Sequence, residues 1–243
     1  MTKKILITGA NGQLGHEMRN ALKGNNRFEC IFTDVAELDI CNAEAVKQII
    51  ADNHIDYIVN CAAYTQVDKA EDNAELCKKI NTDAVENLAR AAADYGARMI
   101  HISTDYVFNG RGYRPYTEDM VPDPQSVYGS TKLEGEKILT DICPESIIIR
   151  TAWLYSPYGN NFVKTMLHLG EEREELSVVA DQIGTPTFAG DLADAIGWIL
   201  DRRMTDKKGI YHFSNEGVCS WYDFAAVIAR LAGNECDVRP ILT

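Results

Sequence analysis

Short apolar runs alternate with longer helix-like stretches over the first 150 residues. Each run is almost continuously apolar, which is typical of parallel strands buried on both faces. Strands that alternate with helices in this way predict right-handed βαβ units in a doubly wound parallel sheet. The predicted strands are residues 5–7, 29–32, 57–59, 99–102 and 146–149, and the predicted helices are residues 13–22, 43–50, 75–95 and 126–140.

The alternation becomes less regular in the second part of the chain. A stretch rich in Gly and Pro, residues 109–125, has the length of a functional or mobile loop. We expect an α/β fold of Rossmann type, with residues 1–150 as the larger domain and residues 151–243 as a smaller C-terminal lobe. Part of residues 190–205 is expected to pack on the larger domain. In the lobe, the predicted helices are residues 162–169, 192–200 and 221–231, and the predicted strands are residues 176–179 and 210–213.

Composition limits the class of protein. The 243 residues are 46% hydrophobic and 25% charged, which is typical of a soluble globular chain. The formal net charge of -12 repels nucleic acids and anionic lipids, so we expect neither nucleic acid nor membrane as a partner. Seven cysteines without a C-x-x-C pair indicate reduced thiols rather than a disulfide framework or zinc site. Without a signal-peptide pattern, we expect a cytoplasmic protein.

A glycine pattern follows the first predicted strand and opens the first predicted helix. Gly9, Gly12 and Gly15 form G-x-x-G-x-x-G. Such glycines let the backbone approach a pyrophosphate, and the helix N-terminus supplies free N–H groups to it. A strand–helix turn without a ligand is the alternative, but the position in a βαβ series favours a dinucleotide site. The loop residues expected at the cofactor are Gly9, Asn11, Gly12, Gln13 and Leu14.

An aspartate ends the second predicted strand. The carboxylate of Asp34 can accept hydrogen bonds from the adenosine ribose and would repel a 2′-phosphate, which favours NADH over NADPH. A simple turn aspartate is the alternative interpretation. Asp39 and Ile40 are expected near the adenine. The choice between NADPH and NADH stays open.

A tyrosine and a lysine share one face of the predicted helix at residues 126–140. Tyr128 and Lys132 are four residues apart, and Ser103, Thr104 and Asp105 end the preceding strand, where ligands bind in open α/β sheets. A nearby ammonium group can stabilise a phenolate, which lets a phenol act in proton transfer near neutral pH. A surface pair without function is the alternative interpretation.

Together these segments resemble the extended short-chain dehydrogenase/reductases. The resemblance rests on the glycine loop, residues 60–64 (NCAAY), residues 103–108 (STDYVF) and residues 128–132 (YGSTK). Further segments are similar to the family of dTDP-4-dehydrorhamnose reductases, namely residues 65–71, 150–155, 159–163 and 181–187. The similarity extends over essentially the whole chain.

This resemblance implies an NAD(P)H-dependent reduction of the 4-keto group of dTDP-4-dehydro-L-rhamnose to dTDP-L-rhamnose, a step in polysaccharide biosynthesis. It makes Tyr128 the proton donor, with Lys132 tuning its acidity and Thr104 orienting the reacting oxygen. The residues implied beside the cofactor are Ala62, Ala63, Tyr64 and Thr65, in addition to Tyr128 and Lys132. The residues implied at the substrate are Val67, Thr104, Asp105, Trp153 and Asn161.

Three other classes of protein are the alternatives to this one. Sugar-nucleotide dehydratases carry an Asp-Glu pair after the threonine, whereas here Asp105 and Tyr106 follow Thr104, so a second proton-transfer group is missing. Another NAD(P)-dependent sugar-nucleotide reductase or epimerase remains an alternative. A non-catalytic, cofactor-binding regulatory subunit is the third, and the presence of Tyr128 and Lys132 argues against it.

The resemblance also bears on metal binding, assembly and length. Family members with a metal-bridged dimer use glutamates at the interface. Glu17 lies near one such place, but Gly190 stands where another glutamate is expected. We therefore expect no metal site, no need for Mg²⁺, and a monomer or weak homodimer. Relatives continue beyond the position of Thr243, so we expect a substrate-binding lobe shortened at its C-terminus.

Overall fold

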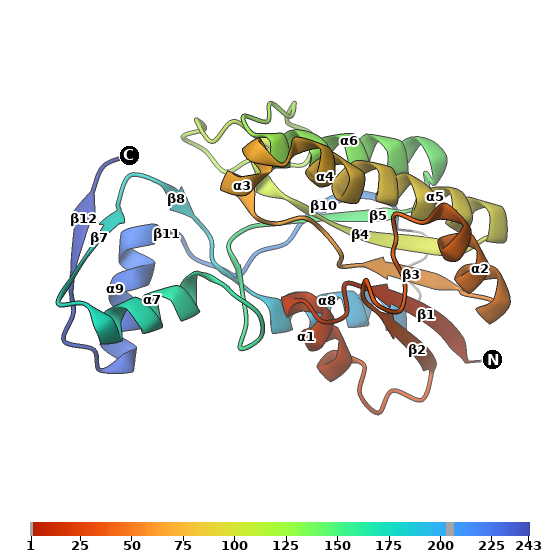
Figure 1. The fold of residues 1–243 in the computed structure, drawn as a ribbon, viewed down its shortest axis with the longest axis horizontal. Coiled ribbons are helices and arrows are strands. Elements are labelled where there is room, and N and C mark those ends of the chain that lie inside the picture. Colours follow the sequence, from red (N-terminus) through yellow and green to blue (C-terminus); the bar gives the residue numbers. More distant parts are fainter. Residues whose placement is uncertain (1, 203–206) are drawn as a thin grey trace.

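Six parallel strands form the main sheet of the protein. The computed structural model describes residues 2–202 and 207–243. The strands lie in the order β10-β5-β4-β3-β1-β2, and each neighbouring pair is parallel (Figure 1). The doubly wound α/β prediction is therefore confirmed. The strands are β1 (Lys3–Thr8), β2 (Phe28–Thr33), β3 (Tyr57–Asn60), β4 (Arg98–Thr104), β5 (Ile147–Thr151) and β10 (Gly209–His212).

Helices cover both faces of this sheet, because successive side chains of a strand point to opposite faces. In β1, Leu6 belongs to the core under α2 and α5, whereas Ile5 and Ile7 belong to the core under α1 and α8. Figure 1 shows these two helical layers on either side of the strands. The helices are α1 (Gln13–Ala21), α2 (Ala43–Asn53), α5 (Ala84–Tyr95), α6 (Val127–Ile142) and α8 (Ala189–Asp201).

The helix predicted over residues 75–95 is interrupted. It consists of α4 (Ala74–Lys78), a π-helical turn (Lys79–Asp83) and α5, and a further short helix, α3 (Val67–Asp72), precedes it. Inside the π-turn, the side chain of Asn81 accepts a hydrogen bond from Tyr64 N at 2.9 Å and donates one to Tyr64 O at 3.1 Å. The turn therefore ties the segment after β3 to the helical layer.

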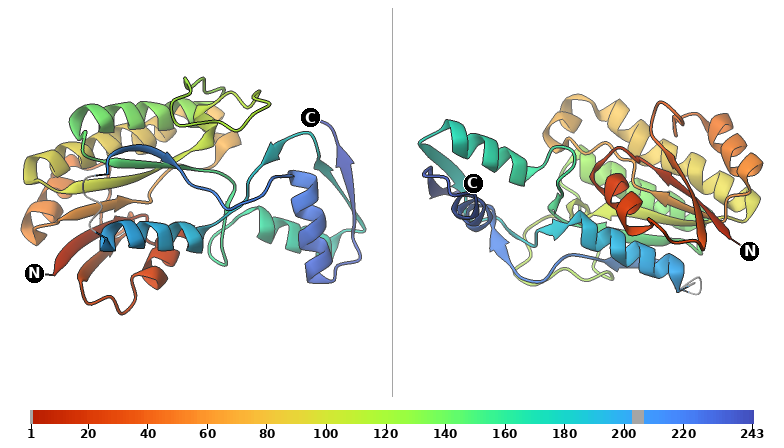
Figure 2. Two further views of the ribbon diagram at one scale, coloured as in Figure 1. Left: turned by 180° about the vertical axis from the view of Figure 1, so that it is seen from behind. Right: turned by 90° about the horizontal axis from the view of Figure 1, so that it is seen from below.

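The smaller lobe packs two helices against short strands at the carboxyl end of the sheet (Figure 2). Its helices are α7 (Phe162–Glu172) and α9 (Trp221–Ala232), and its core contains Met166, Leu176 and Ile228. The strand β12 was not predicted, because it is an exposed edge strand that contains Pro240. The strand pairs are β7 (Glu175–Val179) with β12 (Asp237–Ile241), β8 (Ile183–Gly184) with β11 (Cys219–Ser220), and β6 (Leu154–Tyr155) with β9 (Thr187–Phe188).

The chain returns from the lobe to the main sheet. Helix α8 packs against α1, and β10 then lies beside β5, with Ile210 opposite Ile148. The sequence pattern favours a strand of the lobe at residues 210–213, whereas the structure places this strand at the edge of the main sheet. Pattern alone does not specify a strand's partner, since a short apolar run fits either core. Within residues 2–202 and 207–243, no helix is both long and apolar enough to cross a membrane.

Candidate active site

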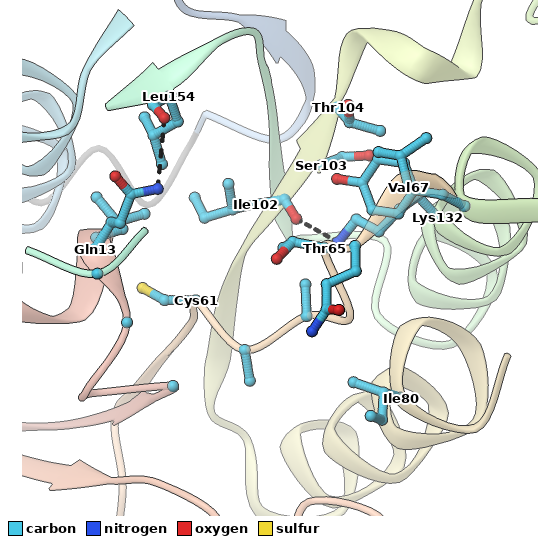
Figure 3. Close-up of a pocket in the computed structure, with 18 of the residues that line it drawn as sticks. Gln13, Cys61, Thr65, Val67, Ile80, Ile102, Ser103, Thr104, Lys132 and Leu154 are labelled. Atoms are coloured by element: carbon cyan, nitrogen blue, oxygen red, sulfur yellow. Dashed lines mark hydrogen bonds between the residues drawn. The ribbon is translucent and has the colours of Figure 1, made fainter. Parts of the chain in front are cut away.

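A cavity of about 1260 Å³ lies between the carboxyl ends of the strands and the smaller lobe. Figure 3 shows the part of its lining where Gln13 and Lys132 lie on opposite sides. Of the predicted site residues, Tyr64 alone is absent from the lining; it packs behind the cavity near Tyr128. The predicted residues that line the cavity are Gly9, Asn11, Gly12, Gln13, Leu14, Asp34, Asp39, Ile40, Ala62, Ala63, Thr65, Val67, Thr104, Asp105, Tyr128, Lys132, Trp153 and Asn161.

The glycine loop lies at the switch point of the sheet, where β2 and β3 flank β1 on opposite sides. Gly9 has a φ of +63°, and a Cβ atom there would lie 2.7 Å from Ala62 Cα. A Cβ on Gly15 would lie 2.3 Å from Gly9 O. Helix α1 begins after Gly12, and no side chain caps its first N–H groups. The loop is therefore a close-packed cradle whose helix N-terminus is free to bind an anion.

The carboxylate of Asp34 shapes this loop. It accepts hydrogen bonds from Asn11 N at 2.9 Å and from Val35 N at 2.8 Å. Asp39 accepts one from Cys41 N at 2.9 Å, and Ile40 is buried beside it. Asp34 thus lies at the cavity, as expected for a ribose contact, and also holds the backbone of the glycine loop in place.

Close packing at the start of α6 brings the tyrosine to the strand end. Ser126 caps the helix by accepting a hydrogen bond from Gly129 N at 3.1 Å. A Cβ on Gly129 would lie 2.2 Å from Tyr106 O, so only glycine lets the helix approach this closely. Burial raises the pKa of the Tyr128 phenol, a hydrogen bond with Thr104 opposes this shift, and Asp105 adds to it. The phenol is therefore protonated at neutral pH.

Lys132 is almost completely buried, with 1% of its surface exposed. Its Nζ donates a hydrogen bond to Ile102 O at 2.7 Å (Figure 3). The same nitrogen lies 3.3 Å from His101 Nε2. Burial lowers its pKa to about 8, although Glu136 and Cys77 oppose this shift. Its ammonium form is therefore less favoured here than in water.

Asp105 adds a second ionisable group at the end of β4. Thr104 Oγ1 donates a hydrogen bond to Asp105 Oδ1 at 3.1 Å. Burial raises the pKa of this carboxyl to about 6, while the hydrogen bond from Thr104 opposes the shift. Its charge consequently changes within the pH range in which enzymes are assayed.

The lobe supplies the opposite wall of the cavity. Trp153 has a φ of +48° and stacks on Trp221, another lining residue. Asn161 Nδ2 donates to Gln13 Oε1 and to Ser156 O, both at 2.8 Å. Because Gln13 belongs to α1, Asn161 links the lobe to the glycine loop. Val67 is half-buried at the start of α3 and packs near Tyr128.

A family model described as the RmlD substrate binding domain matches residues 3–243. The chain belongs to this family. A curated relative, the dTDP-4-dehydrorhamnose reductase of Aggregatibacter actinomycetemcomitans, is 46% identical over 228 residues, which cover 93% of this chain and 78% of the relative. The family resemblance inferred from the motifs is therefore confirmed.

Solved structures of similar proteins have the same fold. A dTDP-4-dehydrorhamnose reductase from Clostridium acetobutylicum is 50% identical, with a TM-score of 0.95 over 99% of this chain and 84% of that one. The enzyme from Bacillus anthracis, solved in complex with NADP, is 42% identical, with a TM-score of 0.95 over 100% of this chain and 86% of that one.

Several lining residues were given no role from the sequence, among them Trp221, Ser103 and Thr151. Trp221 lies far along the chain from Trp153, and no local pattern connects the two. Ser103 and Thr151 lie on neighbouring strands, and their hydroxyl groups are buried without a hydrogen-bond partner among the described residues. Their position at the strand ends was the available signal, since ligands bind there.

The residues named in connection with a metal bridge lie on α1 and α8. Glu17 is buried and accepts a hydrogen bond from Asn20 Nδ2 at 3.1 Å. A Cβ on Gly190 would lie 2.4 Å from the ring of Phe188, so a larger residue would have to displace that ring. Across residues 2–202 and 207–243, no three His, Cys, Asp or Glu side chains gather as metal ligands would.

Proposed function

We propose that this protein reduces the 4-keto group of dTDP-4-dehydro-L-rhamnose to dTDP-L-rhamnose, with NADH or NADPH as the reductant. The observation that carries the proposal is the position of Tyr128. Its phenol is hydrogen-bonded with Thr104 in the cavity that the glycine loop also lines. Membership of the reductase family supports the same reaction.

The glycine cradle fits a nicotinamide dinucleotide. The free N–H groups at the start of α1 suit its pyrophosphate, and the crowding at Gly9 and Gly15 leaves no room for other residues. Asp34, Asp39 and Ile40 would hold the adenosine part, and Ala62, Ala63 and Thr65 would lie along it. When bound, the cofactor supplies the hydride that is added to the carbonyl carbon.

Tyr128 supplies the proton in this proposal. Its phenol keeps the proton at neutral pH and would donate it to the carbonyl oxygen as charge develops there. The Thr104 hydroxyl would orient that oxygen. The Tyr128 phenolate is left after the transfer, and Lys132 would stabilise it when its amine is protonated. A proton from solvent then restores the phenol.

The remaining lining residues would hold the nucleotide sugar. Asp105 and Trp153 would contact the sugar ring, and Val67 would pack against its apolar face. Asn161 would lie near the diphosphate, because it already contacts Gln13 at the start of α1. Tyr64 would act from behind the cavity by fixing the backbone beside the cofactor.

The first experiment mixes the protein with a reduced nicotinamide cofactor and the 4-keto nucleotide sugar, and follows the nicotinamide absorbance. We expect oxidation by the wild type and a loss of at least about 100-fold in kcat for Tyr128→Phe. Tyr95→Phe is the matched control, because Tyr95 is exposed at the end of α5. Cofactor binding without turnover by the wild type would instead indicate a regulatory subunit.

Asp34 provides a test of the cofactor. Its carboxylate would repel a 2′-phosphate, so NADH should be used with the higher kcat/KM. Asp34→Asn should move the ratio of kcat/KM values toward NADPH by roughly 10-fold, since it removes this repulsion. An unchanged ratio would contradict the proposed contact with the ribose.

We further propose a monomer or weak homodimer that assembles without a metal. Sedimentation velocity with Mg²⁺ and with a chelator should give the same sedimentation coefficient. A shift to a larger species on adding Mg²⁺ would contradict this proposal.

A further inference from the structure

Three neighbouring strands carry polar side chains at the same level of one sheet face. Thr8, Asn60 and His101 lie opposite one another in β1, β3 and β4, and none is more than 1% exposed. We call these three residues the polar rung. The level two residues earlier on the same face is apolar and consists of Leu6, Ile58 and Met99. A fully buried polar level requires that each of its groups find a partner.

The hydrogen bonds of Asn60 fix the orientation of its amide. Its Oδ1 accepts from Thr8 Oγ1 at 2.6 Å and from Ala62 N at 3.2 Å. The backbone N–H of Ala62 can only donate, so the oxygen of the amide must face it. The NH₂ group therefore points to the other neighbour, His101 Nδ1, at 3.0 Å.

This orientation fixes the proton on His101. Because Asn60 donates to Nδ1, that nitrogen must be an unprotonated acceptor. Burial, together with nearby Lys132, lowers the pKa of His101 well below its usual value, so the ring is neutral. A neutral ring with a free Nδ1 carries its proton on Nε2. That N–H faces Lys132 Nζ at 3.3 Å.

The N–H group of His101 affects the two forms of Lys132 differently. The neutral amine has a lone pair that accepts from His101 and an N–H that donates to Ile102 O. The ammonium form has no lone pair, so two donors would face each other. The other ionisable groups facing Lys132 are Cys77 from α4 and Tyr128 and Glu136 from α6, and Glu136 is already paired with Arg150.

We propose that the polar rung makes His101 a fixed hydrogen-bond donor to Lys132 and thereby favours the uncharged amine in the protein without cofactor. His101 is in this sense a positioning residue for the proposed reduction, on which this role rests. The lowered pKa of Lys132 agrees with the geometry. The rung also joins the strand ends beneath the cofactor cradle to the lysine, because Ala62 packs against Gly9.

Nitrogen NMR of histidine-labelled protein tests the arrangement without turnover. Neutral imidazoles with the proton on Nδ1 or Nε2 have distinct ¹⁵N shifts, and His101→Gln assigns the signal among the five histidines. We expect His101 to remain in the Nε2–H form from about pH 6 to about pH 9. An Nδ1–H form, or titration within this range, would overturn the proposal.

The substitution Asn60→Asp keeps the shape of the side chain and reverses the direction of its hydrogen bond with His101. Its carboxylate accepts from Nδ1–H, which leaves the lone pair of Nε2 facing Lys132. We expect the His101 ¹⁵N shifts to exchange. The pH midpoint of Lys132 acylation, measured by competitive labelling and mass spectrometry, should rise by about one unit. Thr8→Val is the control, because Ala62 N still fixes the amide and both readouts should stay unchanged.

The outcomes separate this inference from the proposed function. If the reduction occurs, the basic limb of the kcat/KM profile should move upward together with the Lys132 midpoint. If Asn60→Asp changes both the His101 ¹⁵N shifts and the Lys132 midpoint as expected while the wild type lacks reductase activity, the proposed function fails and the hydrogen-bond arrangement stands. If Asn60→Asp leaves both the His101 tautomer and the pH midpoint of Lys132 acylation unchanged, the inference is overturned. If that variant does not fold, the ¹⁵N spectra of the wild type decide.

Discussion

Trp153 and Trp221 stack face to face, with ring centroids 3.4 Å apart and planes 11° from parallel. Trp153 has a φ of +48°, a backbone conformation that bulky residues rarely adopt. Trp221 is the first residue of α9, directly after the N-cap Ser220, which forms a capping box with Asp223. The helix of the lobe therefore supports the tryptophan that we place at the substrate.

Removing that support should weaken binding of the nucleotide sugar. We expect Trp221→Ala to raise KM for the sugar roughly 10-fold, because Trp153 loses its stacking partner and Trp221 leaves the cavity wall. KM for the cofactor should stay unchanged, since the cradle lies on the other side. Steady-state kinetics with each ligand varied in turn measures both. Trp198→Phe on α8 is the control. An equal increase in the KM values for sugar and cofactor in Trp221→Ala would contradict this account.

Alanine substitution of two helical glycines should change the stability of the fold in opposite directions. A Cβ on Gly15 would lie 2.3 Å from Gly9 O, whereas a Cβ on Gly197 would meet only Leu22 Cδ2 at 3.8 Å. We expect Gly15→Ala to destabilise the fold by about 2 kcal/mol and to weaken cofactor binding. Gly197→Ala should stabilise it by about 0.5–1 kcal/mol through helix propensity. Urea unfolding measures both, and equal effects would contradict the cradle geometry.

The charge of Asp105 should make stability depend on pH. Burial raises the pKa of Asp105 in the folded state to about 6, from its ordinary value of 3.8. The folded state therefore loses stability as pH rises between these two values. Above about pH 6 the folded state bears the full free-energy cost of burying the ionised carboxylate. We expect Asp105→Asn to be more stable than wild type by roughly 2 kcal/mol near pH 8, discounted for partial solvation. Near pH 4 the difference should vanish. A difference independent of pH, by thermal unfolding, would refute the assigned cause.

The ion pair of Arg150 and Glu136 lies in the core between β5 and α6. Its two hydrogen bonds are 2.9 and 2.6 Å long, and the side chains are 3% and 2% exposed. We expect Arg150→Met to destabilise the fold by about 3–5 kcal/mol, because it leaves a buried carboxylate without a partner. Combining it with Glu136→Gln should restore part of this loss. Additive losses in denaturant unfolding would contradict the coupling.

The sequence predicted the sheet, and the glycine loop that it singled out lines the cavity, because both features depend on local patterns. Continuous apolar runs mark buried parallel strands, and the glycine loop follows β1 directly. The long helix at residues 75–95 was wrong in one respect, since a π-turn around Asn81 has no periodic signal of its own.

The hydrophobic pattern of the sequence could not predict contacts between segments that are distant along the chain. The position of β10 beside β5 and the stacking of Trp221 on Trp153 depend on how the chain returns from the lobe. The polar rung likewise requires the register of three strands, since Thr8, Asn60 and His101 are far apart in sequence.

The most direct test of the central claim follows the hydride itself. The protein is incubated with the 4-keto nucleotide sugar and a cofactor deuterated at the transferred position, and the product is analysed by NMR and mass spectrometry. We predict dTDP-L-rhamnose with one deuterium on C4, formed by wild type and at least about 100-fold more slowly by Tyr128→Phe. Deuterium at another carbon, or undiminished transfer by Tyr128→Phe, would contradict the account.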